Sequence, residues 1–131
     1  MIMGGNNKII AFCCAESAYR AADRAGRLRI HYPDNVRVIR VPCAGRVSVL
    51  HILKAFEKGA AGVLVMGCQE GACRHLTGNI RAKERVKYAE DLLKEVGING
   101  QRVKMVNFGP DMAQRFAREI EEMVEKIHPV K

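Results

Sequence analysis

Five cysteines are the residues of this sequence with the clearest capacity for chemistry. They are Cys13, Cys14, Cys43, Cys68 and Cys73. A thiolate is both a nucleophile and a ligand for soft metal centres, so these side chains permit more than one kind of site. Three chemistries compete for them: attack on a phosphate ester, a structural zinc site and an iron–sulfur cluster.

The first possibility depends on Cys68 and Arg74, which stand in a C-x5-R relation. In such a loop a thiolate attacks phosphate while Arg and backbone amides bind its oxygens. Position 75 is His where Ser or Thr is usual, and Glu70 adds a negative charge to the intended anion site. The loop also follows the third expected strand instead of the first. A thiol phosphatase with Cys68 as nucleophile and Arg74 as phosphate binder therefore stands as the alternative function.

The two metal sites differ in the ligand spacing that they require. Structural zinc sites typically take a ligand pair from a tight C-x2-4-C turn. The closest plausible pair is Cys68 and Cys73 in C-x4-C spacing, and the other cysteines come singly from different loops. An iron–sulfur cluster also needs four thiolates and accepts them from dispersed loops. The spacing favours a cluster over zinc without deciding between them.

The elements that must position these cysteines alternate between strands and helices. Segments rich in Val and Ile and bounded by Gly, Pro or Asn predict strands over 8–14, 36–43, 62–68 and 102–109. Apolar residues at helical spacing predict helices over 17–26, 46–58, 80–96 and the stretch after Asp111. In 46–58 the stripe expected to be buried is Val47, Leu50, Leu53 and Phe56, and Asp111 with Gln114 could form a capping box.

Four strand–helix units in series predict an α/β fold with a parallel sheet. The segments "IIAF" and "VLVM" are apolar on both faces, as central strands are, whereas "VRVIRV" and "RVKMV" carry charges, as edge strands can. The expected strand order is 2-1-3-4, a small flavodoxin-like sheet with helices on both faces. The carboxyl ends of parallel strands lie along one edge, so the cysteines should converge there. Cys13 and Cys14 should point to opposite faces.

Composition narrows the classes of function. The 131 residues, 48% of them apolar, are expected to form a single domain over 1–131. The net charge of +8 suits an anionic ligand or an acidic partner, but three Tyr, four Phe and no Trp give no stacking platform for nucleic acid. Neither a membrane span nor the order of a signal peptide is visible. We therefore expect a cytoplasmic protein with reduced cysteines and no nucleic-acid or membrane partner.

Four stretches together carry a resemblance to a known family. They are "FCCAESAYRAAD" (12–23), "YPDNVRVIRVPCAGRV" (32–47), "AFEKGAAGVLVMGCQEGACRHLTGN" (55–79) and "LLKEVGI" (92–98). The chain resembles, over about residues 8–108, the iron–sulfur delta subunit of methyl-viologen-reducing hydrogenases. The resemblance implies one 2Fe–2S cluster bound by Cys14, Cys43, Cys68 and Cys73. It also implies electron transfer from a nickel–iron hydrogenase or formate dehydrogenase to the flavin-containing subunit of heterodisulfide reductase.

The sequence departs from the family pattern at two places. Ser17 occupies a position where family members typically have a further cysteine, and the loop that usually reads C-H-P-G-D-C reads "CQEGAC". Four cysteines remain, which is the number that the cluster needs. A cluster-free docking subunit is a further alternative. Arg46 and Arg74 follow cysteine loops and are expected to stabilise the added electron, and Gly45 is expected to let the backbone approach the cluster.

Overall fold

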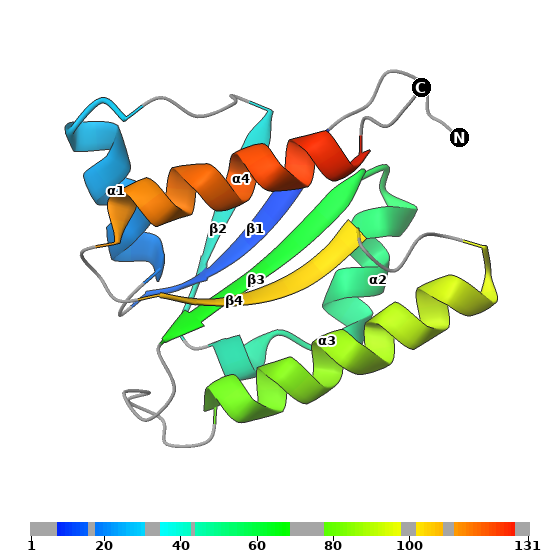
Figure 1. The fold of residues 1–131 in the computed structure, drawn as a ribbon. Helices are drawn as coiled ribbons and strands as arrows, with labels where there is room; N and C mark the ends of the chain where they lie inside the picture. Colours follow the sequence, from blue (N-terminus) through cyan, green and yellow to red (C-terminus); the bar gives the residue numbers. More distant parts are fainter. Residues whose placement is uncertain are drawn as a thin grey trace.

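The computed structural model describes residues 8–15, 18–30, 35–42, 44–68, 78–97, 102–108 and 112–127. In this part of the chain strands and helices alternate (Figure 1). The strands are β1 (Ile9–Cys14), β2 (Val36–Val41), β3 (Gly62–Cys68) and β4 (Val103–Phe108). The α-helices are α1 (Ala18–Arg27), α2 (Val49–Glu57), α3 (Gly78–Glu95) and α4 (Ala113–Ile127), and a short 3-10 turn, η1 (Ala44–Arg46), precedes α2. None of the helices described is long and apolar enough to cross a membrane.

The strands form one parallel sheet in the order β2-β1-β3-β4. This arrangement confirms the predicted α/β fold and the predicted strand order. The two central strands are apolar on both faces because helices cover both sides, whereas β2, at one edge of the sheet, has no fully buried residue. The pattern of charge along the strands was therefore sufficient to separate edge strands from central ones.

Helices pack on both faces of the sheet, as predicted (Figure 1). Helices α1 and α4 lie together on one face, while η1, α2 and α3 contribute to a second core on the other. Successive strand residues alternate between the two cores, as the pleat of a strand requires. The first core contains Ile9, Ala11, Leu64 and Met66, and the second contains Phe12, Val63 and Val65.

Helix α2 begins later than the sequence pattern predicts. Ser48 is its N-cap: the Ser48 hydroxyl accepts the backbone N–H of His51 at 3.1 Å, and His51 Nδ1 accepts the backbone N–H of Ser48 at 3.0 Å. Leu50 is 61% exposed in this helix, whereas Ile52 is completely buried. The prediction that Leu50 is buried was therefore wrong. The other predicted capping residue, Asp111, lies outside the described residues.

Candidate metal centre at the carboxyl edge of the sheet

Cys13 and Cys14 end the central strand β1 and point to opposite faces of the sheet, as predicted from the sequence. Cys13 belongs to the core shared by α1 and α4. Cys14 shares the face of Phe12, two residues earlier in the strand, where η1 contacts β1 and β3. Cys14 is only 1% exposed, although it belongs to neither apolar core, and neither cysteine forms a disulfide. The two neighbouring thiols thus have different surroundings.

The surroundings of Cys13 make it a poor ligand. Its thiol donates a weak hydrogen bond to Met66 Sδ, with the two sulfurs 3.8 Å apart. Burial raises the pKa of the Cys13 thiol from 9.0 to about 12, and the neighbouring Cys14 adds to the rise. Metals and electrophiles react with the thiolate form, which is therefore disfavoured at this position. Cys13 is accordingly part of the core.

The ends of β2 and β3 flank Cys14. Val41, the last residue of β2, lies opposite Cys14, and its carbonyl accepts the backbone N–H of Ala15 at 2.8 Å. Cys43 follows Val41 by two positions and lies outside the described residues. Cys68 is the last residue of β3, which pairs with β1 on the side away from β2. The structure therefore places Cys14 and the backbone of Cys68 at the carboxyl ends of adjacent strands, as expected from the sequence.

The segment that follows Cys43 forms the turn η1, which contains both Gly45 and Arg46. Arg46 is exposed at the end of this turn. Arg85 of α3 donates a hydrogen bond from Nη1 to the carbonyl of Val47 at 3.2 Å and thereby ties η1 to α3. Sequence reasoning missed the role of Arg85, because a single arginine on a helix does not reveal its partner. Cys73 and Arg74 lie outside the described residues.

A hollow of about 340 Å³ lies where β1 and β2 end, and Ala15, which follows Cys14, lines it. Its other walls are Tyr19, Arg20 and Asp23 of α1 and Arg40 of β2. The Arg40 guanidinium carbon lies 5.6 Å from the centroid of the Tyr19 ring, a distance typical of a cation–π contact. Two arginines therefore stand beside the edge that carries Cys14. Sequence reasoning missed Tyr19 and Arg40 because they come from separate elements.

Of the predicted cluster ligands, this edge carries the described thiol of Cys14 and the backbone of Cys68. Thiolates are soft ligands, which select iron–sulfur clusters and zinc over magnesium or calcium. Among the residues whose side chains are described, no three His, Cys, Asp or Glu lie close enough together to hold a metal ion. Of the four predicted ligands, only Cys14 has a described side chain. The full ligand set remains a prediction.

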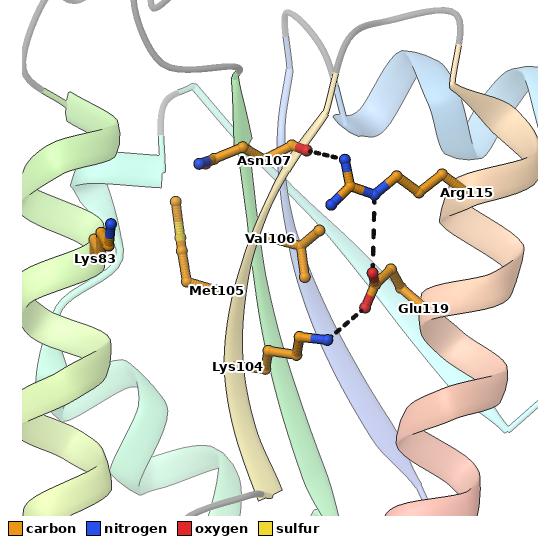
Figure 2. A pocket seen from close by; sticks show the side chains of 7 residues that line it. All are labelled: Lys83, Lys104, Met105, Val106, Asn107, Arg115 and Glu119. Carbon is orange, nitrogen blue, oxygen red and sulfur yellow. Dashed lines mark hydrogen bonds and ion pairs between the residues drawn. The ribbon is translucent and has the colours of Figure 1, made fainter.

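A second hollow, of about 410 Å³, lies along the outer edge of β4 between α3 and α4 (Figure 2). Its charges are largely paired with one another. Glu119 accepts a hydrogen bond from Lys104 Nζ at 3.0 Å and lies 3.8 Å from Arg115, which donates to the carbonyl of Asn107 at 3.2 Å. This network lies on β4, an edge strand of the sheet. Charged side chains on an edge strand commonly prevent it from pairing with strands of other chains. We interpret it as structural.

Comparison with known proteins identifies the relatives of this chain. Residues 9–130 match the family described as methyl-viologen-reducing hydrogenase, delta subunit. The vhu iron-sulfur subunit of the F420-non-reducing hydrogenase of Methanocaldococcus jannaschii is 45% identical over 124 residues, which cover 92% of each chain. The protein of the same name in Methanopyrus kandleri is 43% identical over 95% of this chain and 94% of the relative.

A long reductase subunit is a relative of another kind. It belongs to the ferredoxin:CoB-CoM heterodisulfide reductase of Methanosarcina mazei and is 36% identical over 93% of this chain, but the match covers only 15% of that protein. The region therefore occurs both as a separate hydrogenase subunit and as part of a longer reductase protein. The family match spans most of the chain, and the iron-sulfur subunits of the hydrogenases are similar to this chain in length. The chain thus belongs to the family of methyl-viologen-reducing hydrogenase delta subunits.

Proposed function

We propose that this chain is an electron-transfer subunit that binds one 2Fe–2S cluster through Cys14, Cys43, Cys68 and Cys73. The observation that carries the proposal is the position of Cys14, a buried thiol at the end of a central strand, on the face opposite the core-bound Cys13. The names of the relatives, which are iron-sulfur subunits, support the same class of cofactor. Four thiolates are the number that a 2Fe–2S cluster takes.

Each of the remaining site residues has a defined task in this proposal. The cluster, when bound, accepts and releases one electron. Arg46 and Arg74 supply positive charge, which favours the reduced form and raises the reduction potential. Gly45 has no side chain, so the turn η1 can approach the cluster closely. The chain itself makes and breaks no bond of a substrate.

The partners follow from the two kinds of relative. We place the chain between a nickel–iron hydrogenase, or a formate dehydrogenase, and the flavin-containing subunit of heterodisulfide reductase. A region similar to 93% of this chain is part of the long reductase subunit in Methanosarcina mazei and in Methanosarcina acetivorans. Covalent fusion in these relatives supports contact between the separate proteins. We propose that the chain acts in the cytoplasm, without a nucleic-acid or membrane partner.

The decisive measurement is iron and acid-labile sulfide per chain after anaerobic purification, together with the EPR spectrum after dithionite reduction. We expect about two irons and two sulfides per chain and a signal of a one-electron-reduced cluster. Cys14→Ala should lose most of the iron, because it removes a ligand. Cys13→Ala is the matched control and should keep its iron. Absence of iron after reconstitution of the wild-type chain would overturn the proposal.

Replacement of Gly45 tests the close approach of η1. Gly45→Val adds a branched side chain inside the turn, so we expect it to lower the iron content to about half or less. Gly26→Val is the control, because a Cβ at Gly26 meets no heavy atom within 4 Å and this glycine lies in α1. Iron analysis of both variants makes the comparison. Full iron content in Gly45→Val would show that no close approach is needed.

The alternative functions give different results in two further assays. A thiol phosphatase would hydrolyse p-nitrophenyl phosphate and would lose this activity in Cys68→Ser. A cluster-free docking subunit would bind the reductase without containing iron, even after reconstitution. We expect no hydrolysis, and we expect the chain that binds the reductase to contain iron. Hydrolysis that depends on Cys68 would favour the phosphatase instead.

A further inference from the structure

A hollow of about 450 Å³ lies between the edge strand β2 and the helix α2, on the face of the sheet that carries the second core. Its apolar lining includes Ile10 and Phe12 of β1 and Ile39 of β2. The strand register places Phe12 opposite Ile39 and Ile10 opposite Arg37, so these residues share one face. Ile39 is 37% exposed. The hollow thus presents apolar surface to solvent at the edge of the sheet.

The rim of the hollow is strongly basic. Arg37 belongs to β2. Lys54 lies in α2, and Lys58, the C-cap of this helix, follows it by one helical turn. All three are exposed, and the described residues that line the hollow include no Asp or Glu. Like charges gathered around a concave surface attract an anionic partner and raise its rate of association.

We propose that this hollow is the docking site for an acidic segment of another protein, which inserts an apolar side chain between β2 and α2. An amphipathic segment would use both the apolar floor and the basic rim, as in other groove-binding complexes. Phe12 is only 9% exposed and offers no ring face on which a nucleic-acid base could stack. A simple anion would leave the apolar floor unused.

The hollow lies away from the edge of the sheet that carries Cys14 and Cys68. Lys8 and Ala60, which precede β1 and β3, line it, so it extends toward the amino ends of the strands. Cys14 and Cys68 lie at the opposite ends. A segment bound here would not cover the carboxyl edge, which stays accessible to the rest of the same reductase protein. The choice of occupant rests on the proposed function: we take it to be the heterodisulfide reductase protein that corresponds to the long reductase subunit, to which this region is fused in some relatives.

The test is the dissociation constant of the chain, as purified without oxygen, for this reductase protein from the same organism, measured anaerobically by calorimetry. The double variant Lys54→Glu, Lys58→Glu should weaken binding by about tenfold or more, and this difference should shrink at high salt. The double variant Lys87→Glu, Lys94→Glu makes the same charge change at exposed positions of α3 and should weaken binding by less than about twofold. Equal losses in the two double variants would overturn the proposal.

The apolar part of the docking site is tested by Ile39→Thr. Threonine keeps the β-branched shape that suits a strand but removes apolar surface from the floor of the hollow. We therefore expect binding to weaken by about fivefold. Anionic vesicles and a single-stranded oligonucleotide serve as competing probes. If Lys54→Glu, Lys58→Glu abolishes binding to either probe but leaves the affinity for the reductase protein unchanged, the docking proposal is wrong. Iron content is measured separately, so failure of the cluster proposal would appear in the wild-type chain and not in these affinities.

Discussion

At the scale of single residues, the adjacent thiols of Cys13 and Cys14 lie on opposite faces of the sheet, and only Cys13 belongs to an apolar core. Cys13 lies in the core against Met66, and its raised pKa keeps it in the neutral form. Cys14 lies at the same strand end but on the other face, beside the turn that follows Cys43. The pleat of one strand therefore places one cysteine in the core and the other on the opposite face, where we propose that it is a ligand.

The raised pKa of Cys13 predicts a loss of stability in alkaline solution. The folded chain holds this proton up to about pH 12, whereas the unfolded chain releases it near 9.0. Stability from this group is therefore complete below pH 9 and declines above it, by up to about 1.4 kcal/mol per pH unit. Urea unfolding of the apoprotein from about pH 8 to pH 10.5 measures the effect. Cys13→Ala should show a smaller decline over this range, and identical declines would contradict the assignment.

The opposite orientation of the two cysteines could be predicted from the sequence, because alternation is a property of any strand. The contact between Arg40 and Tyr19 and the hydrogen bond from Arg85 to Val47 could not. Each of these joins two elements, so it depends on how the elements pack and not on local spacing. All four predicted ligands remain predictions: Cys43 and Cys73 lie outside the described residues, and of the other two only Cys14 has a described side chain.

At the scale of elements, the start of α2 depends on a reciprocal pair of hydrogen bonds between Ser48 and His51. Ser48→Ala removes the hydroxyl acceptor and should lower the free energy of unfolding by about 1 kcal/mol. Ser48→Asp keeps an acceptor at the N-cap and should retain most of the stability. Thermal or urea unfolding distinguishes them. A stability of Ser48→Ala equal to that of the wild type would show that the cap contributes little.

Glu119 of α4 forms an ion pair with Lys104 of β4, and its side chain is only 10% exposed between Lys104 and Arg115 (Figure 2). Glu119→Gln removes the carboxylate that Lys104 and Arg115 share, although Lys104 keeps Glu122 at 3.8 Å, and it should lower the free energy of unfolding by about 2 kcal/mol. Glu122→Gln is the control, because its side chain is 47% exposed and 3.8 Å from Lys104. That change should cost less than about 0.5 kcal/mol. Similar losses in both variants would count against a special role of Glu119.

The periodicity of apolar residues located every strand and most of the helical faces, but it did not locate the start of α2. A stripe counted from Val47 puts Leu50 in the core, whereas the helix begins only after Ser48 and buries Ile52. The capping box uses His51 in place of the usual Glu or Gln, so its signature is hard to recognise in sequence. Helix boundaries thus depend on hydrogen bonds that the apolar pattern does not contain.

At the scale of the whole molecule, two apolar cores lie on the two faces of the sheet, and Cys14, the predicted ligand whose side chain is described, belongs to neither. We therefore expect the chain to stay folded without iron, unlike small domains that fold only around their metal. Removal of iron should leave the far-UV circular dichroism spectrum nearly unchanged and should lower Tm, because a bound group stabilises the folded state. Loss of the helical signal from the apoprotein would show that the cluster is needed for folding.

The hydrogen bond from Arg85 to the carbonyl of Val47 has a consequence for the speed of electron transfer. Helix α3 begins five residues after Cys73, and through Arg85 it also holds the segment that follows Cys43. Along the chain, the predicted ligands Cys43 and Cys73 lie four residues before Val47 and five residues before the start of α3. If ligands moved apart when an electron arrived, that rearrangement would slow each transfer. If these cysteines hold the proposed cluster, their common attachment to α3 would limit such movement, so the oxidised and reduced forms would share nearly one geometry.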